Sequence, residues 1–262
     1  MTTIDEARRT SFDDEAERYD RARPSYAEAL VDEVIAHSRI PPDGRILEVG
    51  AGTGKATVLF ARRGYPMVAL EPGANLANVL RRNVAAFPKV QIELSTFEEW
   101  PGADGSFDLV ISAQAFHWVD PKVRYRKAAA ALRPGGAFAL IRNEQFDLAP
   151  SLRAELDDAY ARFFPAAADQ GASDVETQRR ELTAEIERSG CFGPVHVAVF
   201  PWTQRYTVRQ YLDLLGTHSD HAVLEPRLRK PLFDAIAAAI ERHGGILEMP
   251  YASMALIAFR ED

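Results

Sequence analysis

The chain has 262 residues, 47% of them apolar, and a formal net charge of −7. This length can bury one sizeable core, so we expect one elaborated domain. The acidic balance argues against a nucleic acid partner, since binding to phosphate backbones depends on clustered Lys and Arg. Residues 1–23 are charged throughout and no apolar run is long enough to cross a bilayer, so we expect a cytoplasmic protein without a membrane partner.

Short apolar runs alternate with helical patterns along the chain, which is typical of βαβ units in a mainly parallel sheet. Apolar residues at helical spacing predict an amphipathic helix over 25–37 and a second helix over 75–87. Two late apolar runs follow Gly- and Pro-rich turn signals and predict two more strands. The seven predicted strands lie at 45–49, 67–71, 90–94, 107–112, 137–142, 195–200 and 252–259.

Three helical segments do not belong to a minimal sheet of this kind. They are residues 1–40, residues 146–175 and residues 201–249. Because no low-complexity linker separates them from the strands, we expect them to form a helical cap on the sheet. The predicted organisation is an N-terminal helical segment, a ligand-binding core at 41–145, a helical insertion, and a C-terminal part at 176–262 that completes the sheet.

Three glycines follow the first predicted strand in "ILEVGAGTG", at Gly50, Gly52 and Gly54. Glycine permits unusual dihedral angles and lets a ligand approach the main chain, so we expect a ligand on this turn. A Walker A loop is excluded, because the lysine of "GTGKAT" is followed by Ala rather than Ser or Thr. The dinucleotide motif GxGxxG is weakened, because its last glycine is replaced in either register.

A single nucleoside fits the loop better than a dinucleotide does. Glu71 ends the second strand in "VALEPG", about twenty residues on, where a carboxylate can accept both hydroxyls of a ribose. Glu48 and Glu71 would also attract a cationic ligand. The alternatives are an ordinary strand-to-helix turn for the glycines and a solvated turn position for Glu71.

Four motifs in order, "ILEVGAGTG", "VALEPG", "SFDLVISAQAFHW" and "ALRPGGAFAL", resemble those of class I S-adenosylmethionine-dependent methyltransferases. The resemblance covers residues 15–145. "AERYDRARPSY" and "HW" are similar to the small-molecule branch, of the methyltransferase type 11 or trans-aconitate methyltransferase kind. The resemblance implies a Rossmann-like seven-stranded sheet with helices on both faces, S-adenosylmethionine as cofactor and a small soluble acceptor.

The resemblance also assigns cofactor residues. It implies that the glycine loop holds the methionine part, that Glu71 binds the ribose and that Pro72 lies beside the adenine. Thr96 stands where the family usually has Asp, and Phe97 is either an adenine contact or a core residue. The cofactor residues implied are Tyr19, Arg23, Glu48, Gly50, Ala51, Gly52, Gly54, Glu71, Pro72, Thr96, Phe97, Ser112, Ala113 and Gln114.

Methyl transfer is an in-line displacement that depends on alignment and on exclusion of water. The helical cap would supply both, and its aromatic residues would form a pocket wall unless each is a core residue. The candidate substrate-binding residues are Tyr26, Trp118, Trp202, Tyr206, His218 and His221.

His117 is the candidate catalytic residue, because an imidazole past the end of the fourth strand can accept a proton from a hydroxyl or amine. Its alternative is a hydrogen bond to a loop, and a carboxylate acceptor would need no base. His218 and His221 form an HxxH pattern, but no third ligand is evident and we predict no metal site.

The sequence therefore predicts an S-adenosylmethionine-dependent methyltransferase for a small soluble acceptor, with an oxygen nucleophile favoured. One alternative is an NAD(P)-dependent oxidoreductase. Another is a regulator or scaffold that binds S-adenosylmethionine without transferring its methyl group. No motif specifies an oligomeric state.

Overall fold

The computed structural model describes residues 13, 15–102, 104–165, 175–222 and 224–261. Its seven strands form one sheet in the order β3-β2-β1-β4-β5-β7-β6. The first five strands are parallel, and β7 is antiparallel to both of its neighbours, β5 and β6. This confirms the predicted seven-stranded, mostly parallel sheet. The strands are β1 (Ile46–Val49), β2 (Met67–Leu70), β3 (Val90–Glu93), β4 (Phe107–Ala113), β5 (Leu132–Gln145), β6 (His196–Thr207) and β7 (Ile246–Phe259).

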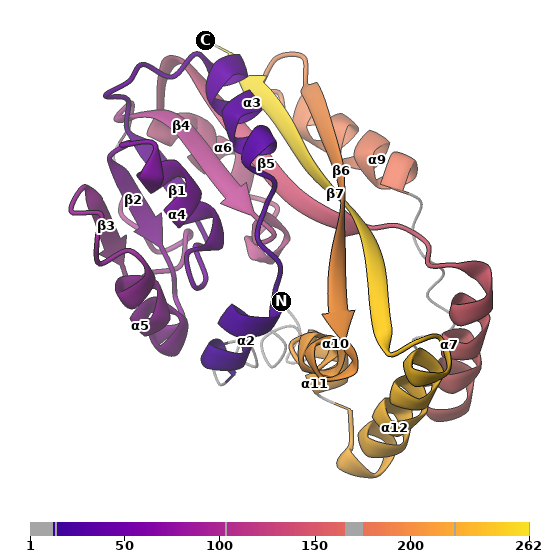
Figure 1. Ribbon diagram of the computed structural model, residues 1–262. Helices are drawn as coiled ribbons and strands as arrows, with labels where there is room; N and C mark the ends of the chain where they lie inside the picture. Colours follow the sequence, from indigo (N-terminus) through magenta and orange to yellow (C-terminus); the bar gives the residue numbers. More distant parts are fainter. Residues whose placement is uncertain (1–12, 14, 103, 166–174, 223, 262) are drawn as a thin grey trace.

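Helices cover both faces of the sheet (Figure 1). Apolar residues of α3, α4 and α5 pack on one face, and those of α6 and α9 pack on the other. The helices are α2 (Ala16–Ala22), α3 (Glu28–Ser38), α4 (Lys55–Arg62), α5 (Ala74–Asn83), α6 (Arg124–Ala131), α7 (Pro150–Phe163), α9 (Val175–Arg188), α10 (Val208–Leu215), α11 (Ser219–Ala222) and α12 (Pro226–Arg242), with a 3₁₀ turn, η1, at Phe116–Trp118.

The central strands are buried on both faces, which explains their continuous apolar sequences. All four residues of β1 and all four of β2 are buried. Glu48 is the single charged residue among these eight, at 1% exposure. A buried charge is costly unless it is neutralised or paired, so Glu48 marks a place where ligand binding or proton uptake compensates that cost.

A second core forms where β6 and β7 extend beyond the rest of the sheet. The two strands pair from His196 opposite Ile257 to Thr207 opposite Ile246, whereas β5 pairs with β7 only as far as Gln145 opposite Tyr251. The projecting ends carry α10 and α12, and α7 packs against them (Figure 1). Buried residues of these elements form the cap core, namely Leu152, Leu156, Tyr211, Leu214, Leu232, Ile236 and Ile240.

The predicted helical segment at 201–249 is wrong at both of its ends. Residues 201–207 continue β6 and residues 246–249 begin β7, so the described part is helical only within 208–242. β6 and β7 each contain one proline. Pro201 lies in the edge strand β6, and Pro250 lies just past the last residue that β7 pairs with β5, so neither interrupts an interior ladder.

The N-terminal and inserted segments are described only in part. Residues 1–12, 14 and 166–174 of these segments lie outside the described residues. The predicted helix over 25–37 is α3, which begins three residues later than predicted, and α2 packs against α5 and α10. Within the part of the chain that the structure describes, no helix has the length and apolar character needed to cross a bilayer.

Candidate active site

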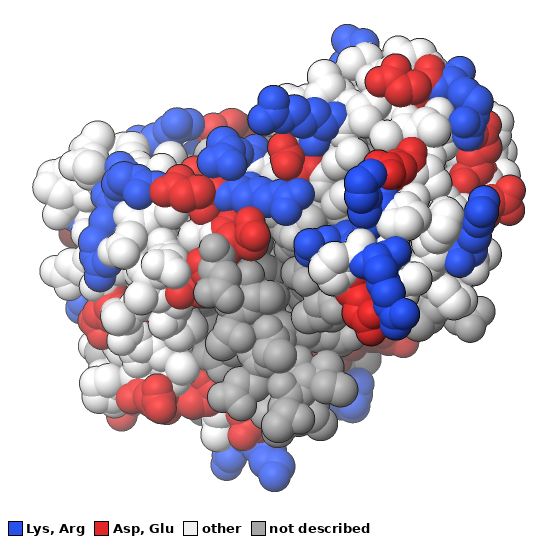
Figure 2. Space-filling view, turned by 90° about the horizontal axis from the view of Figure 1, so that it is seen from below, with Lys and Arg blue, Asp and Glu red and all other residues white. Residues whose placement is uncertain are grey.

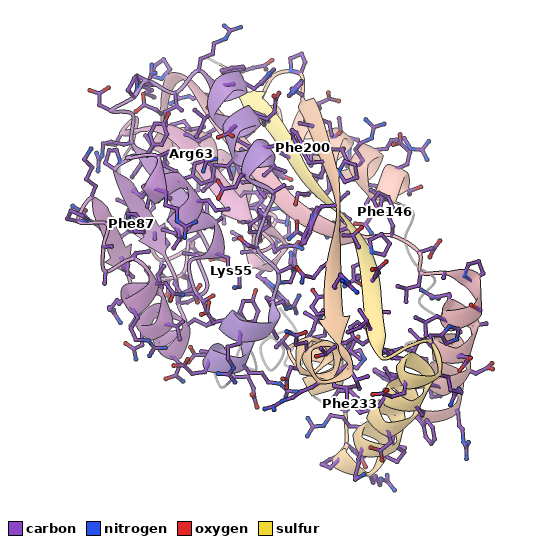
Figure 3. All side chains as sticks on the ribbon, viewed as in Figure 1. Lys55, Arg63, Phe87, Phe146, Phe200 and Phe233 are labelled. Carbon is purple, nitrogen blue, oxygen red and sulfur yellow. The ribbon has the colours of Figure 1, made fainter. Side chains whose placement is uncertain are left out.

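A cavity of about 1190 Å³ lies at the carboxyl ends of β1, β2, β4 and β5, between the sheet and the cap. The strand order changes direction between β1 and β4, which is where open α/β sheets bind ligands. Lys55, labelled in Figure 3, begins α4 and lines this cavity. The residues that the resemblance assigned to the cofactor and that line the cavity are Tyr19, Arg23, Glu48, Gly50, Ala51, Gly52, Glu71, Pro72, Thr96, Phe97, Ala113 and Gln114.

The three glycines of the loop serve different purposes. All have positive φ, at 73° for Gly50, 58° for Gly52 and 89° for Gly54. A Cβ on Gly50 would lie 2.4 Å from the Cβ of Ala115, and one on Gly54 would lie 2.4 Å from Cδ1 of Leu80. A Cβ on Gly52 would meet nothing within 4 Å. Gly50 and Gly54 therefore permit close packing, whereas Gly52 leaves main chain open to a ligand.

Gly54 does not line the cavity, although the resemblance assigned it to the cofactor. It precedes α4 as its N-cap residue, with its α-carbon against α5. Ser112, assigned in the same way, is also outside the lining. Its hydroxyl is fully buried and donates a 2.8 Å hydrogen bond to the carbonyl of Val49, so it joins β4 to the end of β1.

Glu71 connects the two loops that enter the cavity from β1 and β2. Its Oε2 accepts a 2.7 Å hydrogen bond from the amide of Gly52, and its Oε1 accepts a 2.8 Å hydrogen bond from the amide of Gly73. These contacts fix the glycine loop relative to the end of β2.

Glu48 lies deeper, under the glycine loop. Its Oε2 accepts a 2.6 Å hydrogen bond from the hydroxyl of Thr57. Burial raises the pKa of Glu48 to about 8, and the charge of Glu71 adds to this, while the Thr57 hydrogen bond opposes it. The carboxyl is therefore mainly protonated at neutral pH, and a cation bound beside it would favour release of its proton.

The end of β4 carries a strained residue into the cavity. Gln114 has a φ of 57°, and its side-chain amide donates a 2.8 Å hydrogen bond to the carbonyl of Asn143. Non-glycine residues in this conformation are uncommon and occur often at functional sites. The contact ties the end of β4 to the end of β5.

His117 follows on the short turn η1 and faces the cavity. The residue is exposed, although neighbouring protein partly desolvates its ring. Desolvation by this surrounding protein, together with the charges of Arg142 and Arg124, lowers the pKa of His117 to about 4. The imidazole is neutral at physiological pH and is able to accept a proton or a hydrogen bond.

Residues between α2 and α3 cover the cavity from the N-terminal side. The guanidinium of Arg23 lies 5.3 Å from the ring centre of Tyr19. It donates to the hydroxyl of Thr217 at 2.9 Å and to the carbonyl of Thr217 at 3.0 Å. Tyr26 also lines the cavity. Arg23 thus joins the N-terminal segment to the cap at the turn after α10.

The histidines of the cap separate into two roles. His218 lines the cavity, and burial, followed by the charges of Arg23 and His221, lowers its pKa to about 3. His221 is buried and does not line the cavity, contrary to the predicted substrate contact. Its Nδ1 bonds Asp220 and its Nε2 bonds the hydroxyl of Tyr160, both at 2.8 Å.

The HxxH pattern is therefore part of a hydrogen-bonded chain. His218, Asp220 and His221 place ligand atoms within 4.8 Å of one another. Both ring nitrogens of His221 already have protein partners, which favours a tether for α11 over a metal site. Asp220 itself lines the cavity. Burial acts to raise its pKa, but the hydrogen bonds from His221 and the charges of His221 and His218 together lower it.

Two predicted aromatic contacts lie outside the cavity lining. Trp202 stacks on Tyr251 with ring centres 4.9 Å apart and donates from its indole nitrogen to Ser253 at 3.0 Å. The hydroxyl of Tyr206 lies 3.2 Å from that of Tyr251. Both therefore support Tyr251, which lines the cavity and was not predicted. Trp118 lines the cavity as predicted, on the turn that also carries His117.

Sequence reasoning also missed polar residues at the end of β5. Arg142, Asn143, Glu144 and Gln145 line the cavity, and Arg142 forms an ion pair with Glu144. The available signal was their position directly after the apolar run of β5, at the same edge of the sheet as the end of β4. Asp220 lies within the HxxH pattern but was not assigned to the site, and Gln178 of α9 gave no local signal.

Three comparisons with known proteins show the family and the fold. Residues 47–140 match the family model of a methyltransferase domain. A relative from Mycobacterium tuberculosis (strain H37Rv), named an uncharacterized methyltransferase, is 31% identical over 95% of each chain. The trans-aconitate 2-methyltransferase of Variovorax paradoxus is 30% identical over 46% of this chain and 44% of its own. A solved structure from Anaeromyxobacter dehalogenans, assigned as a type II methyltransferase, has a TM-score of 0.62 at 23% identity and covers 91% of this chain and 96% of its own.

The parallel sheet with one antiparallel strand and a glycine loop at the reversal of strand order defines an α/β fold of the kind that binds ligands at this reversal. With the comparisons, the chain belongs to the family of S-adenosylmethionine-dependent methyltransferases.

Proposed function

We propose that the protein transfers the methyl group of S-adenosylmethionine to a small polar acceptor bound between the glycine loop and the cap, with an oxygen nucleophile favoured. The observation that carries the proposal is the opening at Gly52, where the main chain faces the cavity without a side chain and is held by Glu71. A nucleoside with an extended amino acid part needs this kind of approach to backbone amides.

The cofactor residues divide along the length of the proposed ligand. The glycine loop and Glu48 would hold the methionine part, with its two cationic groups, and Glu71 would bind the ribose hydroxyls. Pro72 and Phe97 would contact the adenine. Phe97 is 3% exposed and packs at 6.3 Å from Trp100, so it is both a core residue and a cavity wall.

The size and polarity of the remaining cavity support a small acceptor. The whole cavity has a volume of about 1190 Å³, which exceeds the roughly 300–1,000 Å³ typical of a pocket for one ligand. It therefore has room for a small acceptor beside the cofactor. Besides the proposed cofactor residues, its lining includes His117, Arg142, Glu144 and Asp220, and the charged ones among them carry both signs of charge. Lys, Arg, Asp and Glu are also interspersed over the face seen in Figure 2, without one dominant sign. One relative is named for trans-aconitate, a small organic acid.

The proposed chemistry requires alignment more than acid or base strength. The sulfonium supplies an activated methyl carbon, and this chain's residues would hold an acceptor oxygen in line with it and exclude water, contributing roughly 7–11 kcal/mol. For a hydroxyl acceptor, neutral His117 would take the proton. For a carboxylate acceptor, Arg142 would orient the anion and no base would act.

Binding and transfer are tested separately. Calorimetry should detect binding of S-adenosylhomocysteine and no binding of NADH. Binding of NADH without binding of S-adenosylhomocysteine would favour an oxidoreductase. Isotope transfer from labelled S-adenosylmethionine to small molecules of a cell extract should then give a labelled product. Cofactor binding without transfer to any fraction would favour a binding regulator and overturn the catalytic proposal.

A further inference from the structure

A cluster of two histidines and one glutamate lies where α3 packs beside β6, the edge strand of the sheet that is farther from the glycine loop. Glu33 and His37 are four residues apart on α3 and so share one face of that helix. His196 begins β6, and its Nε2 lies 2.8 Å from Oε1 of Glu33. The rings of His37 and His196 are stacked with centres 3.8 Å apart.

We infer that Glu33, His37 and His196 form a binding site for a divalent transition-metal ion, with zinc as its best-suited occupant. One ligand atom from each of the three residues lies within 4.8 Å of the other two. Tetrahedral zinc holds its nitrogen and oxygen ligands at about 2.1 Å, which separates neighbouring ligand atoms by about 3.4 Å. This spacing lies between the 2.8 Å that separates Nε2 of His196 from Oε1 of Glu33 and the 4.8 Å limit. To bind an ion, the two imidazole rings would turn out of their present stacking so that both point a nitrogen at it.

The ligand types select the ion. Two imidazoles and one carboxylate suit Zn²⁺, Cu²⁺ or Ni²⁺, whereas Mg²⁺ and Ca²⁺ prefer oxygen ligands alone. The three protein ligands leave a fourth position for water. The side chains of His196 and Glu33 are 38% and 34% exposed, so an ion reaches them from solvent.

The backbone that carries the three ligands is firmly held. Leu30, Val31 and Val34 bury the inner face of α3 against the sheet, beside the edge formed by β7 and β6 (Figure 1). His196 is paired with Ile257 in the ladder between β6 and β7. Phe200, labelled in Figure 3, lies four residues further along β6 and packs in the same core. Rigid elements on both sides are what a preorganised metal site needs.

The cluster is separate from the cofactor cavity. None of its three residues lines that cavity. In the register of the sheet His196 aligns with Glu48, but four strand spacings away, or about 19 Å at roughly 4.8 Å per strand. The ion would join the N-terminal helix α3 to the edge strand β6, away from the cofactor cavity, so its proposed effect is on stability and not on methyl transfer.

The test is zinc binding by the full chain after removal of metal with a chelator. Equilibrium dialysis against ZnCl₂ should show one bound ion, and thermal unfolding should move to higher temperature with zinc. Substitution of Co²⁺ should give the visible absorption of a tetrahedral site. H37N and H196N should each weaken zinc binding by at least about tenfold, since each removes one of three protein ligands.

Two control variants locate the ion. His243 pairs with Glu155 at 3.0 Å without a second histidine, so H243N should keep full zinc binding. H221N alters the other histidine cluster and should also keep it. The site would be overturned if the wild-type chain binds no zinc. It would also be overturned if H37N and H196N, folded as stably as wild type, bind zinc with the affinity of wild type. Loss of the ion in H221N alone would place the metal in the cap and overturn it as well.

Discussion

Oε2 of Glu71 accepts a 2.7 Å hydrogen bond from the backbone amide of Gly52. An acid at the end of β2 thereby holds the loop at the end of β1 in shape without a ligand. Preorganisation of this kind lowers the entropy cost of binding. It also means that the glycine loop and Glu71 act as one unit.

The first prediction concerns G52A. The new methyl group would enter the cavity where the main chain is now open, so binding of S-adenosylhomocysteine should weaken by at least about a hundredfold, as the ligand loses its close approach to the backbone. Stability should fall by about 1–2 kcal/mol because φ is positive there. Calorimetry and thermal unfolding measure the two effects.

G64A is the matched control for that variant. Gly64 also has a positive φ, at 87°, and also has open space at its Cβ position, but it follows α4 away from the cavity. It should lose a similar amount of stability and keep full cofactor affinity. Equal affinities of G52A and G64A would show that the loop is not the cofactor site.

The second prediction follows from the raised pKa of Glu48, about 8 against an ordinary 4.5. Between these two pH values the folded protein keeps a proton that the unfolded chain releases, so stability from this group is full below pH 4.5 and is lost as pH rises through about 8. E48Q mimics the neutral carboxyl. Its melting temperature relative to wild type should therefore rise with pH, and parallel pH profiles of the two proteins would contradict the assignment.

The third prediction concerns His117 and requires an identified acceptor. If a hydroxyl is methylated, H117A should lower kcat by about 10²–10⁴-fold, the usual range for loss of a general base. Because the pKa of His117 is lowered to about 4, its protonation should reduce activity only near that pH and leave a plateau through neutrality. Unchanged turnover in H117A would remove this residue from the reaction.

The fourth prediction concerns the tether of α11. Y160F removes the hydroxyl that bonds Nε2 of His221, so it should loosen Asp220, lower stability by about 1 kcal/mol and raise the KM for the acceptor. Affinity for S-adenosylhomocysteine should not change. Y206F loses one hydrogen bond to Tyr251 in the same cap core but leaves α11 tethered. A KM effect of equal size in Y206F would indicate general loosening of the cap rather than the Asp220 contact.

The sheet and the cofactor loop were predictable because their signals are local. Buried parallel strands are continuous apolar runs, and the turns after them need glycines or carry acids at fixed offsets, as at Gly52 and Glu71. The extent of β6 was not predictable from Pro201, because a proline ends an interior strand and is tolerated in an edge strand, and strand order is not a local property.

The sequence by itself determined the fold class, the family and the chain segments that surround the cavity. Tertiary structure alone decided which side chains face that cavity. Trp202 turns to Ser253 and His221 turns to Tyr160, while Arg142 and Gln178 enter the site from elements with no motif of their own. It also brought Glu33 and His37 to His196 across about 160 positions of sequence. The physical reason is that backbone conformation follows from neighbouring residues, whereas burial and hydrogen-bond partners depend on which distant elements pack together.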